Sequence, residues 1–423
     1  MNDSINISAE QARLNANAIK EVPLEKWGPY LSERQWGTVR EDYSPQGDAW
    51  NYFTHDQSRS RVYRWGEDGI AGISDLHQNL CFAIALWNGK DSILKERLFG
   101  LTNTEGNHGE DVKELYYYLD NIPTHFYMEC LYKYPQAAFP YEQLIGVNRE
   151  RTKTEPEFEI LDTDVFRKNQ YFDVKITYAK NNSEDICIDI TITNHADKEA
   201  EIVLLPTLWF RNRWLFGDIK EKPVIEILST KKNVGAAKAT NENLGSYYFY
   251  YAGTAETLMT ENETNAERIF GTPNTSPFVK DAFHDAIAGH DSHVYELLKN
   301  NNKGTKFSPV YRLTIPASGS QRTILRLSKE EIQNPFDDSF DAVFLKRKKE
   351  ADEFLKNLLP ENCPDDIANI QRQALAGLLW TKQFYQYDIE RWLAGDPGGI
   401  PPSPEREYGR NARWKHLKIA DVL

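Results

Sequence analysis

The feature that most constrains the fold is a two-residue alternation in the middle of the chain. Every second residue from 186 to 192 is isoleucine, and the residues between and after them are Cys187, Asp189, Thr191 and Thr193. Successive side chains of a β-strand point to opposite faces, so this pattern predicts a strand with one apolar face. The run 171–179 precedes it, and 180–183 (KNNS) between them is typical of a hairpin turn. The sequence therefore predicts an antiparallel sheet here.

Further short strand-like runs occur on both sides of this hairpin, at 80–87, 200–210, 224–228, 246–252, 309–315 and 322–327. The last two flank 316–320 (PASGS), which predicts another hairpin connection. Many short strands separated by turn residues indicate an antiparallel β-sandwich, which we expect to span 27–328. The polar stretch 272–306 predicts a partly helical insertion within that domain.

After residue 328 the apolar spacing changes from that of strands to that of helices. Residues 340–358 predict one helix, which Pro360 ends. A second helical stripe consists of Ile367, Ile370, Ala374, Leu378 and Tyr385. We expect 329–423 to form a helical segment and the polar residues 1–26 to form an N-terminal arm.

The composition narrows the functional classes. The chain has 423 residues and a formal net charge of −13, and none of its stretches is strongly basic, so we do not expect nucleic acid as a partner. The first thirty residues hold no apolar signal segment, and no run approaches a membrane span. The four cysteines lack CxxC spacing, which is typical of buried free thiols. We expect a cytoplasmic protein without a membrane partner, metal or other cofactor.

Charge and aromatic rings are concentrated between residues 32 and 68. These 37 residues contain seven acids, five arginines, seven aromatics and His55. Buried charge is costly unless it is paired, whereas a surface that binds polyhydroxylated ligands uses carboxylates, guanidinium groups and rings together. The candidate binding residues of this stretch are Trp36, Arg40, Glu41, Asp42, His55, Asp56, Arg64, Trp65, Glu67 and Asp68. A further candidate cluster consists of Asn107, His108, Glu110 and Asp111.

Two interpretations of these clusters stay open at this point. They form either a structural network of ion pairs between sheet and helices, or the polar wall of a sugar site. No HxH or HxxxH spacing supports a metal site. The glycine turns lack the strand–GxGxxG–helix context of nucleotide binding, and no GxSxG motif indicates an esterase.

Long runs of the chain resemble bacterial proteins of glycoside hydrolase family 63. In the N-terminal half the runs are LSERQWGTVREDYS, RSRVYRWGEDGIAGISD, LCFAIALWNG, ILKERLFGLTNTEGNHGEDVKE and YKYPQAAFPY. Further along they are LPTLWFRN, PFVKDAFH and QRQALAGLLWTKQFYQYDIERWLAGDP. The resemblance implies a β-sandwich packed on an (α/α)6 toroid, like processing α-glucosidases, and hydrolysis of α-glycosides with inversion. The implied ligand is an α-glucoside or an oligosaccharide.

Inversion requires a general acid and a general base about 6.5–9.5 Å apart. In the family both carboxylates lie in the toroid, after the segment that resembles WKHLKIADVL here, so the resemblance implies that both lie beyond Leu423. No catalytic residue is therefore carried over. The expected fold is mainly β with α: an antiparallel β-sandwich followed by the first helices of an incomplete (α/α)6 toroid. The expected function is the N-terminal portion of an inverting α-glucosidase-like hydrolase, inactive alone.

Two alternative functions of the chain belong to other functional classes. The chain could be a non-catalytic carbohydrate-binding or interaction module, with Trp36, Trp65 and Glu67-Asp68 forming one sugar site. It could also be half of a split glycosidase, whose toroid is completed by a separate chain. Each large apolar side chain left exposed forgoes about 1.5–3 kcal/mol. We therefore expect the helical tail to fold back on the sandwich, to pair with another chain, or to promote aggregation.

Overall fold

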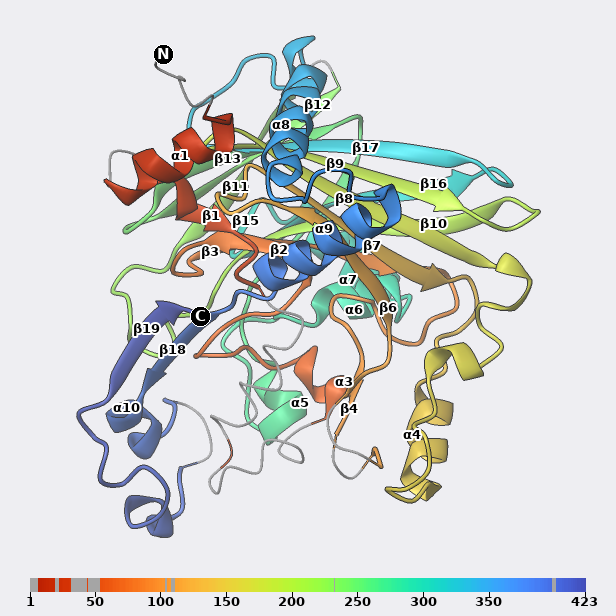
Figure 1. Ribbon diagram of the computed structural model, residues 1–423. Coiled ribbons are helices and arrows are strands. Elements are labelled where there is room, and N and C mark those ends of the chain that lie inside the picture. The colour runs from red at the N-terminus through yellow and green to blue at the C-terminus, as the bar shows by residue number, and fades with distance from the viewer. Residues whose placement is uncertain are drawn as a thin grey trace.

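The computed structural model of the chain describes residues 7–19, 23–31, 44, 54–102, 105–107, 111–231, 233–397 and 401–423. Two large antiparallel sheets dominate this part of the chain (Figure 1). The six-stranded sheet has the order β1 (Trp27–Gly28), β2 (Ile70–Asp75), β3 (Leu80–Trp87), β10 (Ala200–Phe210), β16 (Lys306–Ile315) and β14 (Glu256–Thr260). The nine-stranded sheet has the order β15 (Lys303–Gly304), β11 (Val224–Lys231), β12 (Val234–Asn241), β13 (Gly245–Ala252), β17 (Ser320–Ser328), β9 (Asp185–Asn194), β8 (Tyr171–Asn182), β7 (Tyr127–Pro135) and β6 (Leu115–Asn121).

Two short strand pairs and several helices complete the described fold. The pairs are β4 (Gly100–Leu101) with β5 (Asp111–Val112), and β18 (Phe384–Asp388) with β19 (Lys418–Val422). The α-helices are α1 (Ala9–Ala18), α3 (His55–Ser58), α4 (Tyr141–Glu150), α5 (Ala266–Phe270), α6 (Ala282–Ile287), α7 (Ser292–Asn300), α8 (Ser339–Lys356), α9 (Asp365–Trp380) and α10 (Ile389–Ala394). The 3-10 turns are η1 (Leu24–Lys26), η2 (Ile160–Asp162), η3 (Arg167–Asn169) and η4 (Pro404–Glu407). None of the described helices is long and apolar enough to cross a membrane.

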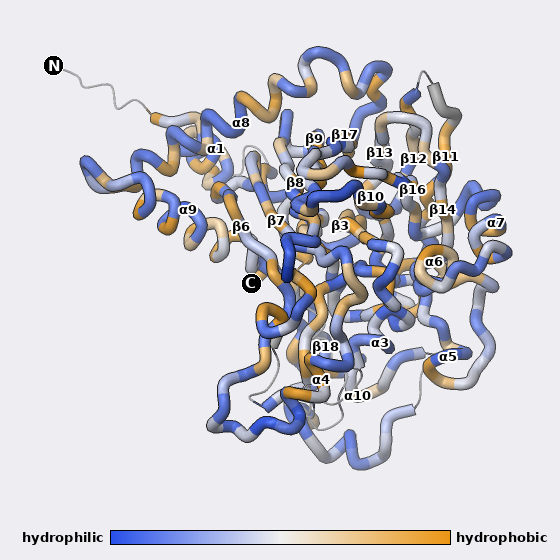
Figure 2. Tube along the Cα trace, turned by 90° about the vertical axis from the view of Figure 1, so that its right-hand side faces the viewer, coloured by the Kyte–Doolittle hydropathy of each residue, from blue (hydrophilic) through white to orange (hydrophobic). Residues whose placement is uncertain are grey.

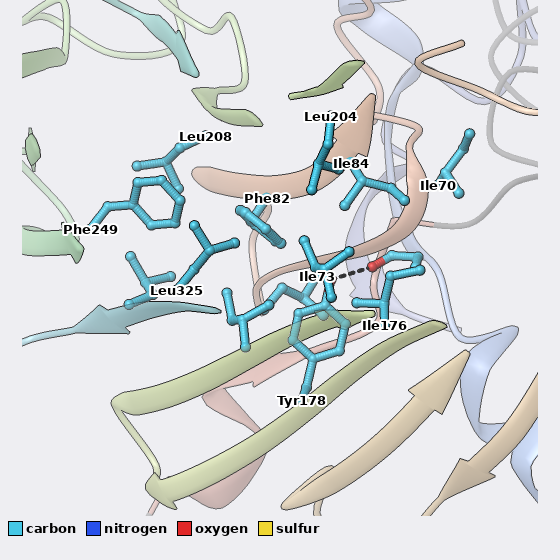
Figure 3. Close-up of a cluster of buried hydrophobic side chains, with 14 of the residues drawn as sticks. Ile70, Ile73, Phe82, Ile84, Ile176, Tyr178, Leu204, Leu208, Phe249 and Leu325 are labelled. Carbon is cyan, nitrogen blue, oxygen red and sulfur yellow. Dashed lines mark hydrogen bonds between the residues drawn. The ribbon is translucent and has the colours of Figure 1, made fainter. Parts of the chain in front are cut away.

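The alternating isoleucines lie where their pattern predicts. They belong to β9, which pairs with β8 as a hairpin, and all four are at most 1% exposed. Their apolar face contributes to a core that both sheets share: Ile73 and Phe82 come from the six-stranded sheet, and Tyr178 and Leu325 come from the nine-stranded sheet (Figure 3). The predicted hairpin of β8 and β9 is confirmed.

The hairpin predicted at 316–320 is wrong. β16 pairs with β10 and β14 in one sheet, whereas β17 pairs with β13 and β9 in the other. The connection therefore crosses from one sheet to the other. A short turn-forming sequence indicates a reversal of direction, but it does not tell which strand the chain will pair with.

The predicted fold class, a β-sandwich followed by the first helices of an (α/α)6 toroid, is wrong. After β17 the chain returns to the nine-stranded sheet: α8 packs on β7, β8 and β9, and α9 packs on β6. Figure 2 shows α1, α8 and α9 beside these strands. Trp380 of α9 joins the shared core, stacks on Tyr118 of β6 at 5.2 Å and donates its indole N–H to the Asp120 carbonyl at 3.0 Å. The predicted boundaries at 26/27 and 328/329 stay predictions.

The stripe predicted for the second helix does not face the sheet. Ile367, Ile370 and Leu378 are 54–71% exposed, and α9 is anchored by Ala376 and Trp380 instead. Tyr385, predicted as the last residue of the stripe, lies in β18. Helical spacing shows which residues share a face, but the sheet contacts decide which face is covered. The helical tail folds back on the sheets by its other face.

Candidate functional site

Residues from four parts of the chain line a cavity of about 400 Å³. They lie in 61–65, 215–216 and 264–275, and in 391–397 together with Arg406, so the walls come from widely separated parts of the sequence. The aromatic side chains that line it are Trp65, Phe216, Phe270 and Trp392. We call this cavity the Trp pocket. Part of its lining comes from α5 and α10, which both lie below the sheets in Figure 1.

The first wall is fixed mainly through its backbone. The amide of Val62 donates to Thr264 Oγ1 at 3.1 Å, and the ammonium group of Lys280 donates to the Arg61 carbonyl at 2.7 Å. Arg211 donates to the Arg64 carbonyl at 2.8 Å. These buried cations replace the regular ladder of a strand, because a loop must satisfy its carbonyls with other groups. The segment is therefore held in position although it belongs to no sheet.

The opposite wall is the helix α10 and the turn that follows it. Asp388 caps the helix by accepting a hydrogen bond from the Arg391 amide at 3.3 Å. Trp392 packs in a small apolar cluster with Trp65 and Tyr387. At Gly395 the chain adopts φ +81°, and a Cβ there would meet the Pro402 ring at 2.6 Å, so the turn requires glycine.

Paired charges form the polar edge of the Trp pocket. Arg64 donates to Asp396 at 3.0 Å, and its guanidinium lies 3.6 Å from Asp218. Arg391 also pairs with Asp218, whose side chain is 1% exposed. The guanidinium of Arg406 lies over the Trp392 ring, 3.8 Å from its centroid. Trp65 and Trp392 are 1% and 3% exposed, so the rings that the pocket offers to a ligand are those of the half-buried Phe216 and Phe270, beside paired guanidinium and carboxylate groups. Such a set suits a ligand with apolar faces and many hydroxyls.

A second, much smaller cavity of about 30 Å³ lies among buried charges. The charged residues that line it, which we call the buried cluster, are Glu67, Asp68, Glu96, Arg97, Lys280 and Lys306. Arg97 Nε lies 3.2 Å from Asp68, and Lys306 pairs with Glu96 at 2.5 Å. With three acids and three bases, the cluster can neutralise itself. Pairing of this kind is what allows charges to stay in a protein interior.

Burial disfavours the charged forms of Glu67 and Lys280 in this cluster. Burial raises the pKa of Glu67 to about 7, although the positive charge of Lys280 acts to lower it. Burial lowers the pKa of Lys280 to about 8, and the neighbouring Arg97 lowers it further. Burial also raises the pKa of Glu96, but the attraction of Lys306 outweighs it and the net pKa of Glu96 is lowered.

The structure separates the predicted site residues of 55–68. Trp65 lines the Trp pocket and Arg64 pairs at its edge, whereas Glu67 and Asp68 belong to the buried cluster. The His55 ring packs edge-on against Phe99 with 5.1 Å between centroids. Asp56 accepts from Arg59 at 3.0 Å and pairs with Arg268.

The other predicted residues lie elsewhere or outside the described part of the chain. Asn107 donates to the carbonyls of Thr152 and Glu155, each at 3.1 Å, and so ties two loops together. The backbone of Asp111 belongs to β5. The residues outside the described ranges are Trp36, Arg40, Glu41, Asp42, His108 and Glu110. As a ligand-binding set, the predicted residues stay a prediction.

Most residues of the Trp pocket did not stand out in the sequence, among them Phe270, Trp392 and Asp396. A signal for two of them exists in 391–398 (RWLAGDPG), where a tryptophan and an aspartate flank a glycine turn at the end of a short helix. Loops that follow regular elements commonly carry binding residues. Among the residues that the structure describes, no group of three His, Cys, Asp or Glu side chains could hold a metal ion.

No protein-family model matches the chain. A relative in Saccharomyces cerevisiae, the uncharacterized protein YMR196W, is 40% identical over 464 residues. The match takes in 99% of this chain and 42% of the yeast protein, so the chain spans less than half the length of that relative.

Solved structures with a weak overall likeness include two sugar-related proteins. One is described as a kojibiose phosphorylase from the human microbiome, with 9% identity, a TM-score of 0.26, and coverage of 88% of this chain and 42% of that one. The other is a galactose mutarotase related enzyme from Lactobacillus acidophilus, with 8% identity, a TM-score of 0.28, and coverage of 62% and 90%. Scores this low carry no argument for the fold or function of this chain.

Proposed function

We propose that the Trp pocket binds a carbohydrate, and that this chain is the sugar-binding N-terminal portion of an inverting α-glucosidase-like glycoside hydrolase. The observation that carries the proposal is the arrangement of the half-buried Phe216 and Phe270 rings in one cavity, whose lining also includes the charged residues Arg391, Asp396 and Arg406. The resemblance to glycoside hydrolase family 63 supports the same ligand class. It carries no catalytic carboxylate onto the described pocket, so the activity proposed for these 423 residues is binding without hydrolysis.

The physical chemistry of the pocket supports this ligand class. Phenylalanine supplies a rigid ring face, and burying the exposed part of Phe216 and Phe270 against the C–H face of a pyranose ring removes apolar surface from water. Guanidinium and carboxylate groups that are held by one another are already oriented, so little side-chain entropy is lost when they bond to sugar hydroxyls. A cavity of about 400 Å³ also lies within the usual range of about 300–1,000 Å³ for small-ligand sites.

The proposal is tested by calorimetric titration of the purified chain with methyl α-glucoside and maltose. We expect Kd values in the millimolar range, and in Trp392→Ala a Kd about 2- to 13-fold weaker, since an aromatic contact is worth about 0.5–1.5 kcal/mol. Trp414→Ala is the matched control, because Trp414 is 56% exposed and does not line the pocket.

Circular dichroism of each variant shows whether it is folded, and Phe270→Ala serves as a second pocket variant if Trp392→Ala is not. Absence of binding by the folded wild type would contradict the proposal. Release of glucose by the wild-type chain, lost on substitution of one of its own carboxylates, would contradict the part that denies hydrolysis.

A further inference from the structure

The loop 271–277 separates the Trp pocket from a second, open hollow of about 420 Å³. Three residues of the loop, Thr272, Pro273 and Thr275, line both spaces. Residues that line two spaces at once lie between them, so the two hollows are neighbours. We call the second space the outer hollow.

The two hollows differ in chemistry. The described side chains of the Trp pocket include four large aromatics, whereas those of the outer hollow include none. The outer hollow is lined instead by hydroxyl, amide and carboxylate groups, which belong to Thr272, Asn274, Thr275, Ser276 and Glu267. One space therefore suits the faces of a sugar ring, and its neighbour suits hydroxyl groups.

The rim between the hollows is held by hydrogen bonds on both sides. The Asn274 side chain donates to Asn265 Oδ1 at 3.2 Å and accepts from the Glu267 amide at 3.2 Å. Thr275 donates to Glu263, which also accepts from the Trp214 indole at 2.9 Å. A surface held in this way is pre-organised, so a ligand that spans it does not have to order the loop first.

We infer that the Trp pocket and the outer hollow are two subsites for one ligand, an oligosaccharide of at least two sugar units. One ring lies in the Trp pocket, the glycosidic bond crosses the rim at Thr272–Thr275, and the next unit bonds with its hydroxyls to Glu267 and Ser276. This inference rests on the proposed function and adds the size of the ligand and the direction in which it extends. A monosaccharide fills only the Trp pocket.

The test compares glucose, maltose and maltotriose as ligands of the full chain by calorimetry. For the wild type we expect maltose to bind about 3- to 10-fold more tightly than glucose, the gain of about one additional hydrogen bond in water. The double variant Glu267→Ala/Ser276→Ala should lose this gain while its Kd for glucose stays unchanged. Trp392→Ala should weaken the binding of all three sugars. Glu330→Ala, at an exposed acid outside both hollows, is the matched control.

The outcomes separate the two ideas. Equal Kd values for glucose and maltose in the wild type would overturn the second subsite and leave the sugar pocket standing. An equal loss of affinity for glucose and maltose in the double variant would also overturn the second subsite, because the outer hollow would then contribute to binding of the first ring. If no sugar binds to the wild type, the proposed function fails and this inference fails with it.

Discussion

The segment 61–68 begins at the Trp pocket and ends in the buried cluster. Charged and aromatic residues of its first part line or flank a cavity, whereas the charged residues at its end lie among buried ion pairs. Trp65 lines a cavity of about 400 Å³, whereas Glu67 and Asp68 line one of about 30 Å³. At the pocket, Arg64 pairs with Asp396 on the C-terminal helix side; in the cluster, Arg97 pairs with Asp68 between the sheets and the insertion. One stretch with a dense mixture of charge and rings thus contains both a candidate binding surface and the support beneath it.

The two regions are also mechanically connected. Lys280 lines the buried cluster, yet it donates to the carbonyls of Ser58 at 3.2 Å and Arg61 at 2.7 Å. Its ammonium group lies 4.4 Å from the centroid of the Tyr63 ring. The cluster therefore holds the segment whose next residues form the wall of the pocket. Changes in the cluster should act on stability, and changes in the pocket should act on affinity.

The largest expected effect is on stability, from Arg97→Ala. Asp68 would stay buried without its guanidinium partner, and breaking a buried pair in this way costs about 3–5 kcal/mol. Urea denaturation followed by circular dichroism measures the free energy of unfolding. Arg167→Ala is the control: its pair with Asp164 is 73% and 84% exposed, so we expect a loss below about 1 kcal/mol.

The double variant Asp68→Asn/Arg97→Met distinguishes the cost of an orphaned charge from the value of the pair. Removing both charges leaves nothing unpaired, so the double variant should be more stable than Arg97→Ala. If both unfold at the same urea concentration with the same slope, the loss in Arg97→Ala comes from packing, and the contrast between cluster and pocket weakens.

A smaller effect is expected on the pH dependence of stability in Glu67→Gln. The carboxyl of Glu67 has a pKa of about 7 in the folded chain against an ordinary value of 4.5, because burial disfavours its charge. The folded state therefore keeps a proton that the unfolded state releases, and the free energy of unfolding falls as pH rises from about 4.5 to 7. Glutamine keeps the bond from Asn262 through its oxygen but does not titrate. Relative to the variant, the wild type should lose about 1–3 kcal/mol across this window.

Urea denaturation of both proteins at pH 4.5, 5.5, 6.5 and 7 measures this difference, in which the contributions of the other carboxyl groups cancel. Glu330→Gln, at an exposed carboxylate, is the control and should follow the wild type. A constant difference between wild type and Glu67→Gln would mean that Lys280 keeps Glu67 ionised throughout, as a structural ion pair.

How far the sequence predicts the fold depends on where the contacts come from. The strands β3 and β10 lie at the residues that their apolar runs predict, because such runs are buried wherever they pair. β12 (VGAAKATN) escaped notice because alanine and glycine have weak strand propensity, and its pairing with β11 and β13 decides its state. The sequence also did not predict that 316–320 crosses between the sheets or that the apolar stripe of α9 is exposed. The reason is the same, because both depend on partners far away in the chain.

Part of the candidate site could be predicted from the sequence. Trp65 stood out because it lies in a short stretch crowded with charge, and Glu67 and Asp68 stood out beside it for the same reason. Nothing local could show that Glu67 faces Asn262 while Trp65 approaches Trp392. Composition shows that a segment is unusual, but only the tertiary contacts show which of its residues line the Trp pocket and which belong to the buried cluster.

The smallest expected effect on stability, with a separate effect on affinity, comes from Phe270→Ala. Phe270 is partly buried, lines the Trp pocket, and has the guanidinium of Arg61 5.6 Å from its ring centroid. A cation–π contact at such a site is worth about 0.5–1 kcal/mol, and partial burial of the ring adds a fraction of the roughly 1.5–3 kcal/mol that a fully buried ring contributes, so the loss of unfolding free energy should be about 1–2 kcal/mol. The affinity for maltose should fall about 3- to 10-fold, because an aromatic face of the pocket is removed.

Phe336→Ala is the matched control for this prediction. Phe336 is also partly buried and packs against another ring, that of Phe340 at 5.3 Å, but it lies outside the pocket. It should lose stability to a similar degree and keep its affinity for maltose. If Phe270→Ala loses stability without losing affinity, the pocket behaves like the buried cluster, as a part of the support, and the contrast between the two regions no longer holds.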